Sequence, residues 1–249
     1  MTKITFIILT SVIALISDIH AQITIACAAN MKYAMDALIA AYCESGKQCK
    51  LISGASGVLA AQIKNGAPYD VFISADTQYP ESLFVHGFTS GKPRVYAYGR
   101  VVLWTEKNIN LTKGIAVLQS PDIAKIAIPD PKNAPYGRAA VSALRQAGLL
   151  ESVNQKLVFG ESISQTAQYI VTLAVDIGFN AKGIVMSVPM KGKGTWIELD
   201  TTVCPKIAQA AVVCKYGKIN NPVASKQLED FLFSQQAGEI LKQNGFDVP

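Results

Sequence analysis

The sequence contains few histidines and few charged residues. Two of the 249 residues are histidines, and Asp, Glu, Lys and Arg together make up 16% of the chain. His20 lies in an N-terminal segment that we expect to be cleaved. His86 lies near the end of a short predicted helix, where a lone histidine is usually solvated or caps the helix. Zinc sites need several converging imidazoles or carboxylates, so this composition disfavours a zinc-binding protein.

The signature of a serine nucleophile is also missing. A nucleophile elbow requires Gly-x-Ser-x-Gly, and around Ser56 the second glycine is replaced by Val58. The sequence offers no credible base for Ser56, so an exported serine hydrolase is the least supported function that we consider. Gly192 and Gly194 belong to a predicted hairpin turn and lack the strand-to-helix context of a nucleotide-binding loop.

Long apolar runs are absent after the N-terminus. Lys3 precedes an apolar run over residues 5–16, which is shorter than the roughly 20 residues that a membrane span needs. The small residue Ala21 and then Gln22 follow, which predicts a secretory signal peptide cleaved after Ala21. An uncleaved anchor is the alternative. We therefore expect an exported protein that is soluble once it is processed.

Export makes disulfide bonds between the five cysteines plausible, because oxidising compartments favour disulfides. Cys43 and Cys49 flank a predicted turn, and Cys204 and Cys214 bracket the passage between two apolar runs. We predict the disulfides Cys43–Cys49 and Cys204–Cys214, with Cys27 buried at the end of the first strand. The alternative is that all five are unpaired small hydrophobic residues.

Two similar strand-loop-helix units begin the mature chain. Apolar residues 23–27 lead to Asn30, a candidate N-cap that precedes a helical pattern, and residues 53–57 lead into a second helix that Gly66 ends. A helix N-terminus has unpaired N–H groups and about half a positive charge, and Ser56 adds a hydroxyl donor. If the two strands are neighbours in a parallel sheet, both helix starts point to one place, which predicts an anion-binding site.

The middle of the chain repeats this arrangement. The proline-bounded loop over residues 130–137 leads into one helix, and Ser162 with Gln165 predicts a capping box at the start of another. The whole pattern indicates an α/β protein with two lobes of mostly parallel sheet flanked by helices and a ligand cleft between them. We expect a signal peptide at residues 1–21, a first lobe made of residues 22–101 and 208–249, and a second lobe made of residues 102–207.

Three segments carry a resemblance to a known family. The segments Ala28-Ala29-Asn30, Ser53-Gly54-Ala55-Ser56-Gly57 and Asn65-Gly66-Ala67-Pro68-Tyr69-Asp70-Val71-Phe72-Ile73-Ser74-Ala75-Asp76 resemble the periplasmic molybdate-binding proteins of ABC importers. The likeness covers nearly all of the chain after the first two dozen residues, and the last segment is its most specific part.

The resemblance implies the type II periplasmic binding protein fold and an oxyanion site with contributions from both lobes. It assigns the ligand contacts to Asn30, Ser56, Tyr136, Ile163 and Ala181. Some members of the family carry serine where Asn30 stands and a ligand-contacting tyrosine in the loop that holds Ala181, whereas others share the asparagine and alanine found here. No cofactor is implied, and no metal other than the one inside the oxyanion.

The function implied is capture of molybdate, and also of tungstate, in the periplasm for the membrane permease of an ABC importer. We expect a monomer that catalyses no reaction and binds no nucleic acid. The alternative keeps the fold but binds sulfate, phosphate or a small organic anion. Lysine and arginine are absent from the four loop-to-helix entries except for Lys132, so we expect neutral N–H and O–H groups to hold the anion.

Overall fold

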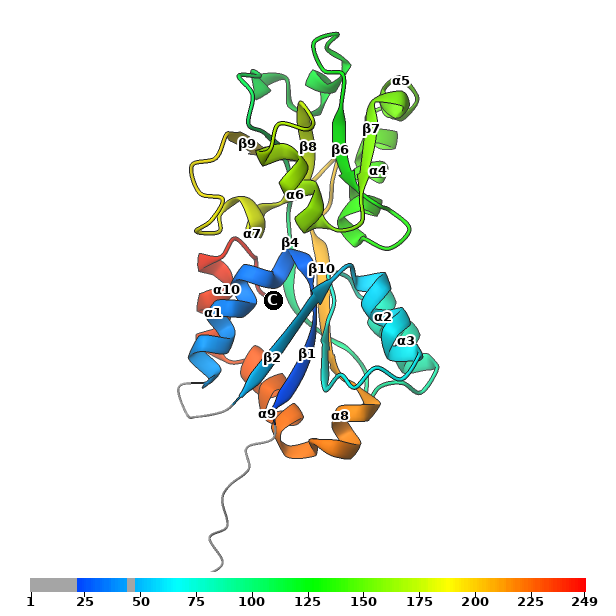
Figure 1. The fold of residues 1–249 in the computed structure, drawn as a ribbon, viewed down its shortest axis with the longest axis vertical. Coiled ribbons are helices and arrows are strands. Elements are labelled where there is room, and N and C mark those ends of the chain that lie inside the picture. The colour runs from blue at the N-terminus through cyan, green and yellow to red at the C-terminus, as the bar shows by residue number, and fades with distance from the viewer. Residues whose placement is uncertain (1–21, 44–47) are drawn as a thin grey trace, which may run out of the picture.

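The computed structural model describes residues 22–43 and 48–249, so the predicted signal peptide lies outside the described residues. The described chain forms two lobes that are stacked along the long axis of the molecule, each built on one five-stranded sheet (Figure 1). Within the described ranges, no helix has both the length and the apolar character that a bilayer crossing demands.

The first lobe contains the two ends of the described chain. Its sheet has the strand order β2-β1-β3-β10-β4, in which β1 runs parallel to β2 and β3 while β10 runs antiparallel to β3 and β4. Its elements are β1 (Ile23–Ala28), η1 (Ala29–Met31), α1 (Lys32–Cys43), β2 (Cys49–Gly54), α2 (Ser56–Lys64), β3 (Val71–Ile73), α3 (Gln78–Val85), β4 (Arg94–Gly99), β10 (Ile207–Val213), α8 (Lys215–Asn220), α9 (Pro222–Leu232) and α10 (Gln235–Gln243).

The second lobe is inserted between β4 and β10. Its sheet has the order β7-β6-β8-β5-β9, with β6 parallel to β7 and β8, and β5 antiparallel to β8 and β9. Its elements are β5 (Val101–Thr105), η2 (Leu111–Gln119), β6 (Ile126–Pro129), α4 (Pro135–Gln146), α5 (Leu150–Val153), η3 (Asn154–Lys156), β7 (Leu157–Gly160), α6 (Ile163–Val171), β8 (Ile177–Ala181), α7 (Lys182–Val185) and β9 (Thr195–Glu198).

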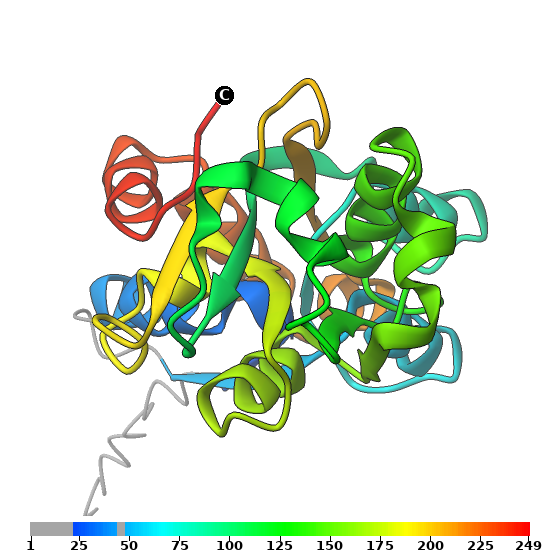
Figure 2. The same cartoon turned by 90° about the horizontal axis from the view of Figure 1, so that it is seen from above.

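The predicted two-lobed α/β fold is confirmed, but the sheets are more mixed than the prediction of mostly parallel strands. Half of the strand pairings in each sheet are antiparallel. The cause is the crossing between the lobes, because the strand with which the chain enters each sheet from the other lobe, β10 in the first sheet and β5 in the second, is antiparallel to both of its neighbours. Seen from above, the C-terminal helices (red) and the helices after β6 (green) lie on opposite sides of the molecule (Figure 2).

The strand register explains where the helices begin. In the first lobe the last residues of β1 and β2, Ala28 and Gly54, are paired, so η1 and α2 begin side by side. In the second lobe Pro129 pairs with Gly160, so α4 and α6 also begin side by side. The C-terminal ends of neighbouring parallel strands thus bring four helix starts to the junction between the lobes.

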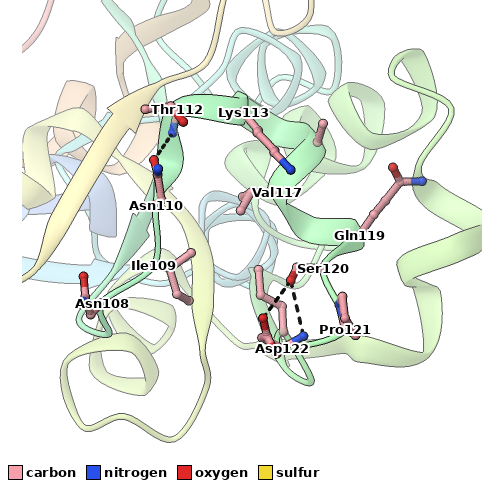
Figure 3. A pocket seen from close by; sticks show the side chains of 12 residues that line it. Asn108, Ile109, Asn110, Thr112, Lys113, Val117, Gln119, Ser120, Pro121 and Asp122 are labelled. Carbon is pink, nitrogen blue, oxygen red and sulfur yellow. Dashed lines mark hydrogen bonds between the residues drawn. The ribbon is translucent and has the colours of Figure 1, made fainter.

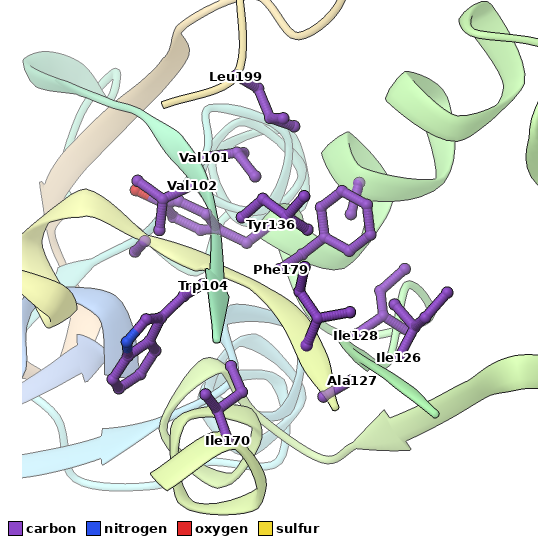
Figure 4. Packing of buried hydrophobic residues seen from close by; sticks show 14 of the residues in the cluster. Val101, Val102, Trp104, Ile126, Ala127, Ile128, Tyr136, Ile170, Phe179 and Leu199 are labelled. Atoms are coloured by element: carbon purple, nitrogen blue, oxygen red, sulfur yellow. The ribbon is translucent and has the colours of Figure 1, made fainter. Parts of the chain in front are cut away.

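The apolar core of the second lobe reaches this junction. Trp104 and Phe179 are completely or almost completely buried there, and Tyr136 lies among Val102 and neighbouring side chains of the same cluster (Figure 4). The cluster also includes Ala29 from the first lobe. The packing is therefore continuous across the junction, and the structure shows the lobes in contact.

The predicted disulfide Cys204–Cys214 is wrong. Cys204 is buried in the second lobe, whereas Cys214 is buried in a cluster of the first lobe. The seven-residue strand β10 separates them, and at about 3.3 Å per residue it places them more than roughly 20 Å apart, whereas a disulfide needs Cα atoms within about 7 Å. Burial raises the pKa of the Cys204 thiol to about 11 and that of Cys214 to about 12, so both stay protonated. Cys27 is buried in β1, as predicted.

The pair Cys43 and Cys49 stays a prediction that a mass spectrum can test. Their Sγ atoms lie 3.4 Å apart across the end of α1 and the start of β2. In protein exported to an oxidising compartment, non-reducing peptide mapping is expected to show one crosslink, Cys43–Cys49, with Cys27 alkylated only after denaturation. A crosslinked peptide containing Cys204 and Cys214, or any crosslink to Cys27, would contradict this placement of the thiols.

Candidate functional site

A small cavity lies between the two lobes where the four helix starts meet. Its empty volume is about 220 Å³. The space that it leaves for the centre of a water molecule is about 10 Å³, far below the roughly 300–1,000 Å³ of pockets for drug-sized ligands, so this cavity suits a smaller occupant such as an inorganic ion. The residues that line it come from both lobes: Ala28, Ala29, Asn30, Gly54, Ala55, Ser56, Ala75, Ala134, Pro135, Tyr136 and Ile163.

Three α-helices direct their N-termini at this cavity. Ser56 is the first residue of α2, Tyr136 the second residue of α4, and Ile163 the first residue of α6. The N–H groups in the first turn of a helix have no acceptor within the helix, and each helix start carries about half a positive charge. Among the described lining residues, the phenol of Tyr136 is the one ionisable side chain. The cavity therefore attracts an anion without any formal positive charge.

Ser56 is oriented by the strand that follows its helix. Its side chain is buried, and its Oγ accepts a hydrogen bond of 3.0 Å from the backbone N–H of Ala75, just after β3. Because a hydroxyl can accept and donate at once, the proton of Ser56 remains available to an occupant of the cavity. The role of Ser56 as a donor to a bound anion stays a prediction.

Asn30 does not cap a helix, contrary to the sequence prediction. It lies inside the short helix η1, which begins at Ala29 and has no side-chain cap, and its side chain contacts Gln209 of β10 and Tyr136 of the other lobe. Its Nδ2 donates to Gln209 Oε1 at 3.0 Å and to the Tyr136 hydroxyl at 3.5 Å. Its Oδ1 is buried and has no hydrogen-bond partner within the described part of the chain.

The hydroxyl of Tyr136 accepts two hydrogen bonds near the place where the chain crosses between the lobes. It accepts from Asn30 Nδ2 and, at 3.3 Å, from Gln209 Nε2. A Cβ atom added to Gly99, the last residue of β4, would lie 2.0 Å from this hydroxyl, so the close approach requires glycine. Burial raises the pKa of Tyr136, and the hydrogen bonds from Asn30 and Gln209 offset only part of the rise, so the phenol stays neutral.

Ile163 and Ala181 differ in their relation to the cavity. Ile163 lines it, and its carbonyl accepts from Asn180 Nδ2 at 3.2 Å. Ala181 does not line the cavity, and its N–H donates to Asn180 Oδ1 at 2.9 Å. The geometry thus brings Asn30, Ser56, Tyr136 and Ile163 together, whereas Ala181 is not among the residues that line the cavity, and its contact with the ligand stays a prediction.

Several contacts between the lobes lie beside the cavity and were not predicted from the sequence. The N–H of Gly57 donates to the carbonyl of Asn133 at 2.9 Å, and Arg138 pairs with Asp76 while also donating to the Tyr79 hydroxyl at 3.0 Å. Burial raises the pKa of Asp76, although the hydrogen bond from Tyr79 and the charge of Arg138 oppose the rise. These partners are distant in sequence, so no local pattern could have revealed them.

A larger hollow on the second lobe is not a competing site. It has an empty volume of about 1290 Å³ and is lined by one continuous segment from Asn108 to Ile123 (Figure 3). Some of its polar side chains are engaged in local hydrogen bonds, since Asn110 Oδ1 accepts from the backbone N–H of Thr112 and the Ser120 hydroxyl donates to Asp122. Across residues 22–43 and 48–249, no three His, Cys, Asp or Glu residues are grouped so as to hold a metal ion.

Comparisons with known proteins agree on one family. The family model described as "Bacterial extracellular solute-binding protein" matches residues 23–247. The Molybdate-binding protein ModA of Azotobacter vinelandii is 36% identical over 231 residues, which cover 92% of this chain and 90% of that protein. The Molybdate-binding protein ModA of Rhodobacter capsulatus is 36% identical over 194 residues, covering 78% and 75%. The solved structure of the Azotobacter vinelandii periplasmic molybdate-binding protein superposes with a TM-score of 0.85 at 31% identity, covering 91% of this chain and 99% of that one.

Proposed function

The chain belongs to the bacterial extracellular solute-binding protein family, and from this we propose that it captures molybdate, and tungstate with it, in the periplasm and delivers it to the membrane permease of an ABC importer. The observation that carries the proposal is the small uncharged cavity at which three helix N-termini and the Ser56 hydroxyl converge. The names of its relatives, which describe molybdate-binding proteins, support the choice of anion. The protein acts as a monomeric binding protein and not as an enzyme.

The energetics of such a site are adequate without a charged side chain. A hydrogen bond to a charged group contributes about 1.5–3 kcal/mol, and roughly six of them exceed the ~8 kcal/mol that micromolar affinity requires. The surplus offsets dehydration of the anion and closure of the lobes. The candidate donors are the Ser56 hydroxyl, the N–H groups of η1, and the first-turn N–H groups of α2, α4 and α6 apart from those of Gly57 and Gln165, which already donate to Asn133 and Ser162.

The size and chemistry of the cavity favour molybdate over other tetrahedral anions. Sulfate has the same charge and shape but shorter bonds, so donors fixed at the right distance for molybdate cannot all reach its oxygens. Phosphate retains a proton near neutral pH and needs an acceptor for it. Among the described residues lining the cavity there is no carboxylate to accept that proton. A small organic anion would additionally need space for its carbon skeleton.

Titration calorimetry with three anions tests this function. Purified protein is titrated in turn with molybdate, sulfate and phosphate at one pH and ionic strength. We expect micromolar or tighter binding of molybdate, similar binding of tungstate, and binding of sulfate and phosphate that is weaker by at least tenfold. Equal affinities for sulfate and molybdate, or no heat with molybdate, would refute the proposal.

The ion pair between the lobes provides a prediction about closure. Arg138 and Asp76 belong to different lobes, so their ion pair stabilises the closed arrangement. Replacing Arg138 by methionine removes this pair, and we expect the free energy of molybdate binding to weaken by about 1–2 kcal/mol. This value lies between the contributions of exposed and of buried ion pairs. Calorimetry measures the affinity, and small-angle scattering should show a smaller gain in compactness on adding molybdate than in the unmodified protein.

The matched control replaces Lys107 by methionine. Lys107 pairs with Asp176, and both residues belong to the second lobe, so this change removes an ion pair without touching closure. Molybdate affinity should then be unchanged. Equal losses of affinity in the two variants would show that Arg138 acts through general charge and not through contact between the lobes.

A further inference from the structure

Gln209 is a buried glutamine in the strand that returns from the second lobe. It lies in β10, and its side chain is completely buried among apolar neighbours on that strand. Its Oε1 accepts from Asn30 Nδ2 at 3.0 Å and from the Tyr96 hydroxyl at 3.1 Å, and its Nε2 donates to the Tyr136 hydroxyl at 3.3 Å. Gln209 does not line the cavity, yet it contacts two residues that do.

The side chain of Asn30 presents the wrong group for an anion. Its donor, Nδ2, is engaged with Gln209 and Tyr136, whereas its acceptor, Oδ1, is the end without a partner. A buried acceptor that makes no hydrogen bond costs free energy, and it repels the oxygens of an oxyanion. Asn30 is 2% exposed and lines the cavity, so this mismatch lies at the site itself.

We propose that Gln209 is a positioning residue that turns the amide of Asn30 so that Nδ2 donates to the bound oxyanion. In this arrangement the amides of Asn30 and Gln209 both exchange their N and O ends. The two protons of Gln209 Nε2 then go to Asn30 Oδ1 and to the Tyr96 hydroxyl, and Gln209 Oε1 accepts the proton of the Tyr136 hydroxyl.

The exchange keeps the three partners of Gln209, and the hydrogen bond from Asn30 Nδ2 to the Tyr136 hydroxyl is replaced by one to the anion. Gln209 already lies within hydrogen-bond distance of Asn30, Tyr96 and Tyr136, so none of them has to leave its place. Each tyrosine hydroxyl can donate or accept. Asn30 Oδ1 gains a donor, and its Nδ2 becomes free to bind the anion. Only a side chain that has both a donor and an acceptor supports both arrangements, which accounts for an amide at this buried position.

The first test replaces Gln209 by methionine, which keeps the size of the side chain and removes its hydrogen bonds. The inference rests on the proposed function, so molybdate is the probe. We expect molybdate affinity to fall about ten- to hundredfold, as for one misplaced donor to a buried anion. In the matched control, Tyr96→Phe, the hydrogen bond between Gln209 and Asn30 persists, so the loss should stay below about threefold.

A double-mutant cycle separates positioning from general packing. If Gln209 acts through Asn30, then Gln209→Met in an Asn30→Ala background should weaken molybdate binding less than about twofold further. In isotope-labelled protein, molybdate should shift the side-chain amide resonances of Asn30, and Gln209→Met should reduce that shift. If the wild-type protein binds molybdate and Gln209→Met binds it with the same affinity, the inference is overturned and the proposed function stays intact. The same holds if the losses from Gln209→Met and Asn30→Ala are fully additive. Absence of molybdate binding to the wild-type protein would instead overturn the proposed function.

Discussion

Replacing Gly57 by valine is expected to weaken molybdate binding by about 3 kcal/mol or more, which is at least about a hundredfold. Gly57 lies in the first turn of α2, and its N–H donates to the carbonyl of Asn133 in the second lobe at 2.9 Å. A Cβ atom at this position would lie 2.6 Å from the Tyr79 hydroxyl and 3.0 Å from the Cα atom of Asn133. The second contact is with backbone, so it is relieved only if the lobes move apart.

The valine should therefore act as a wedge that holds the lobes open. If a ligand binds only the closed state, its affinity falls by the additional free energy that closing the lobes over the valine side chain requires. The melting temperature of the ligand-free protein should change little, because the open state accommodates the side chain. Calorimetry with molybdate and thermal melting without it are the measurements.

The control for Gly57 is another glycine in a helix. Gly238 lies in α10, and a Cβ atom there would meet no atom within 4 Å. The variant Gly238→Val should bind molybdate with the affinity of the unmodified protein. Unchanged affinity in Gly57→Val would mean that the lobes do not have to approach as closely as they do in this structure.

Replacing Ser56 by alanine is expected to cost about 1–3 kcal/mol of molybdate affinity, because a buried anion is left with one donor fewer. The hydroxyl accepts from the N–H of Ala75 and keeps its proton for the ligand. The change also leaves that N–H without its acceptor, so we expect a lower melting temperature of the ligand-free protein as well.

A second buried serine provides the comparison for Ser56. Ser225 lies in α9 of the first lobe, and its Oγ has no hydrogen-bond partner. The variant Ser225→Ala removes the same group from a buried helix position away from the cavity, so molybdate affinity should not change. If Ser56→Ala also binds molybdate normally, the donors to the anion lie elsewhere.

Short-range patterns were sufficient to predict the helix starts that build the cavity. The helical spacing after Ser56 and the Ser162 capping position depend on residues within a few places of each other, and the structure contains both, with Ser162 Oγ accepting from the N–H of Gln165 at 3.3 Å. The alternation of strands and helices likewise indicated two α/β lobes. These features arise from local hydrogen bonding and from the period of apolar residues, which a single sequence displays directly.

The features that were missed depend on how distant segments meet. Asn30 resembles a helix cap locally, but its amide is held by Gln209, 179 positions away. Cys204 and Cys214 are close in sequence, yet an extended strand that crosses from one lobe to the other separates them. The same crossing introduces antiparallel strands into sheets that were predicted to be mostly parallel. In each case the path of the chain between the lobes overrides the local pattern.

The most direct test of the account is to locate molybdenum in crystals of the protein grown with molybdate. Anomalous diffraction measured at the molybdenum absorption edge marks the position of the metal without reference to any protein contact. The account predicts one strong peak in the cavity between the lobes, within hydrogen-bonding reach, through its oxygens, of Ser56 and of the first-turn N–H groups at Tyr136 and Ile163. A peak elsewhere, or a cavity that stays free of molybdenum at saturating molybdate, would contradict it.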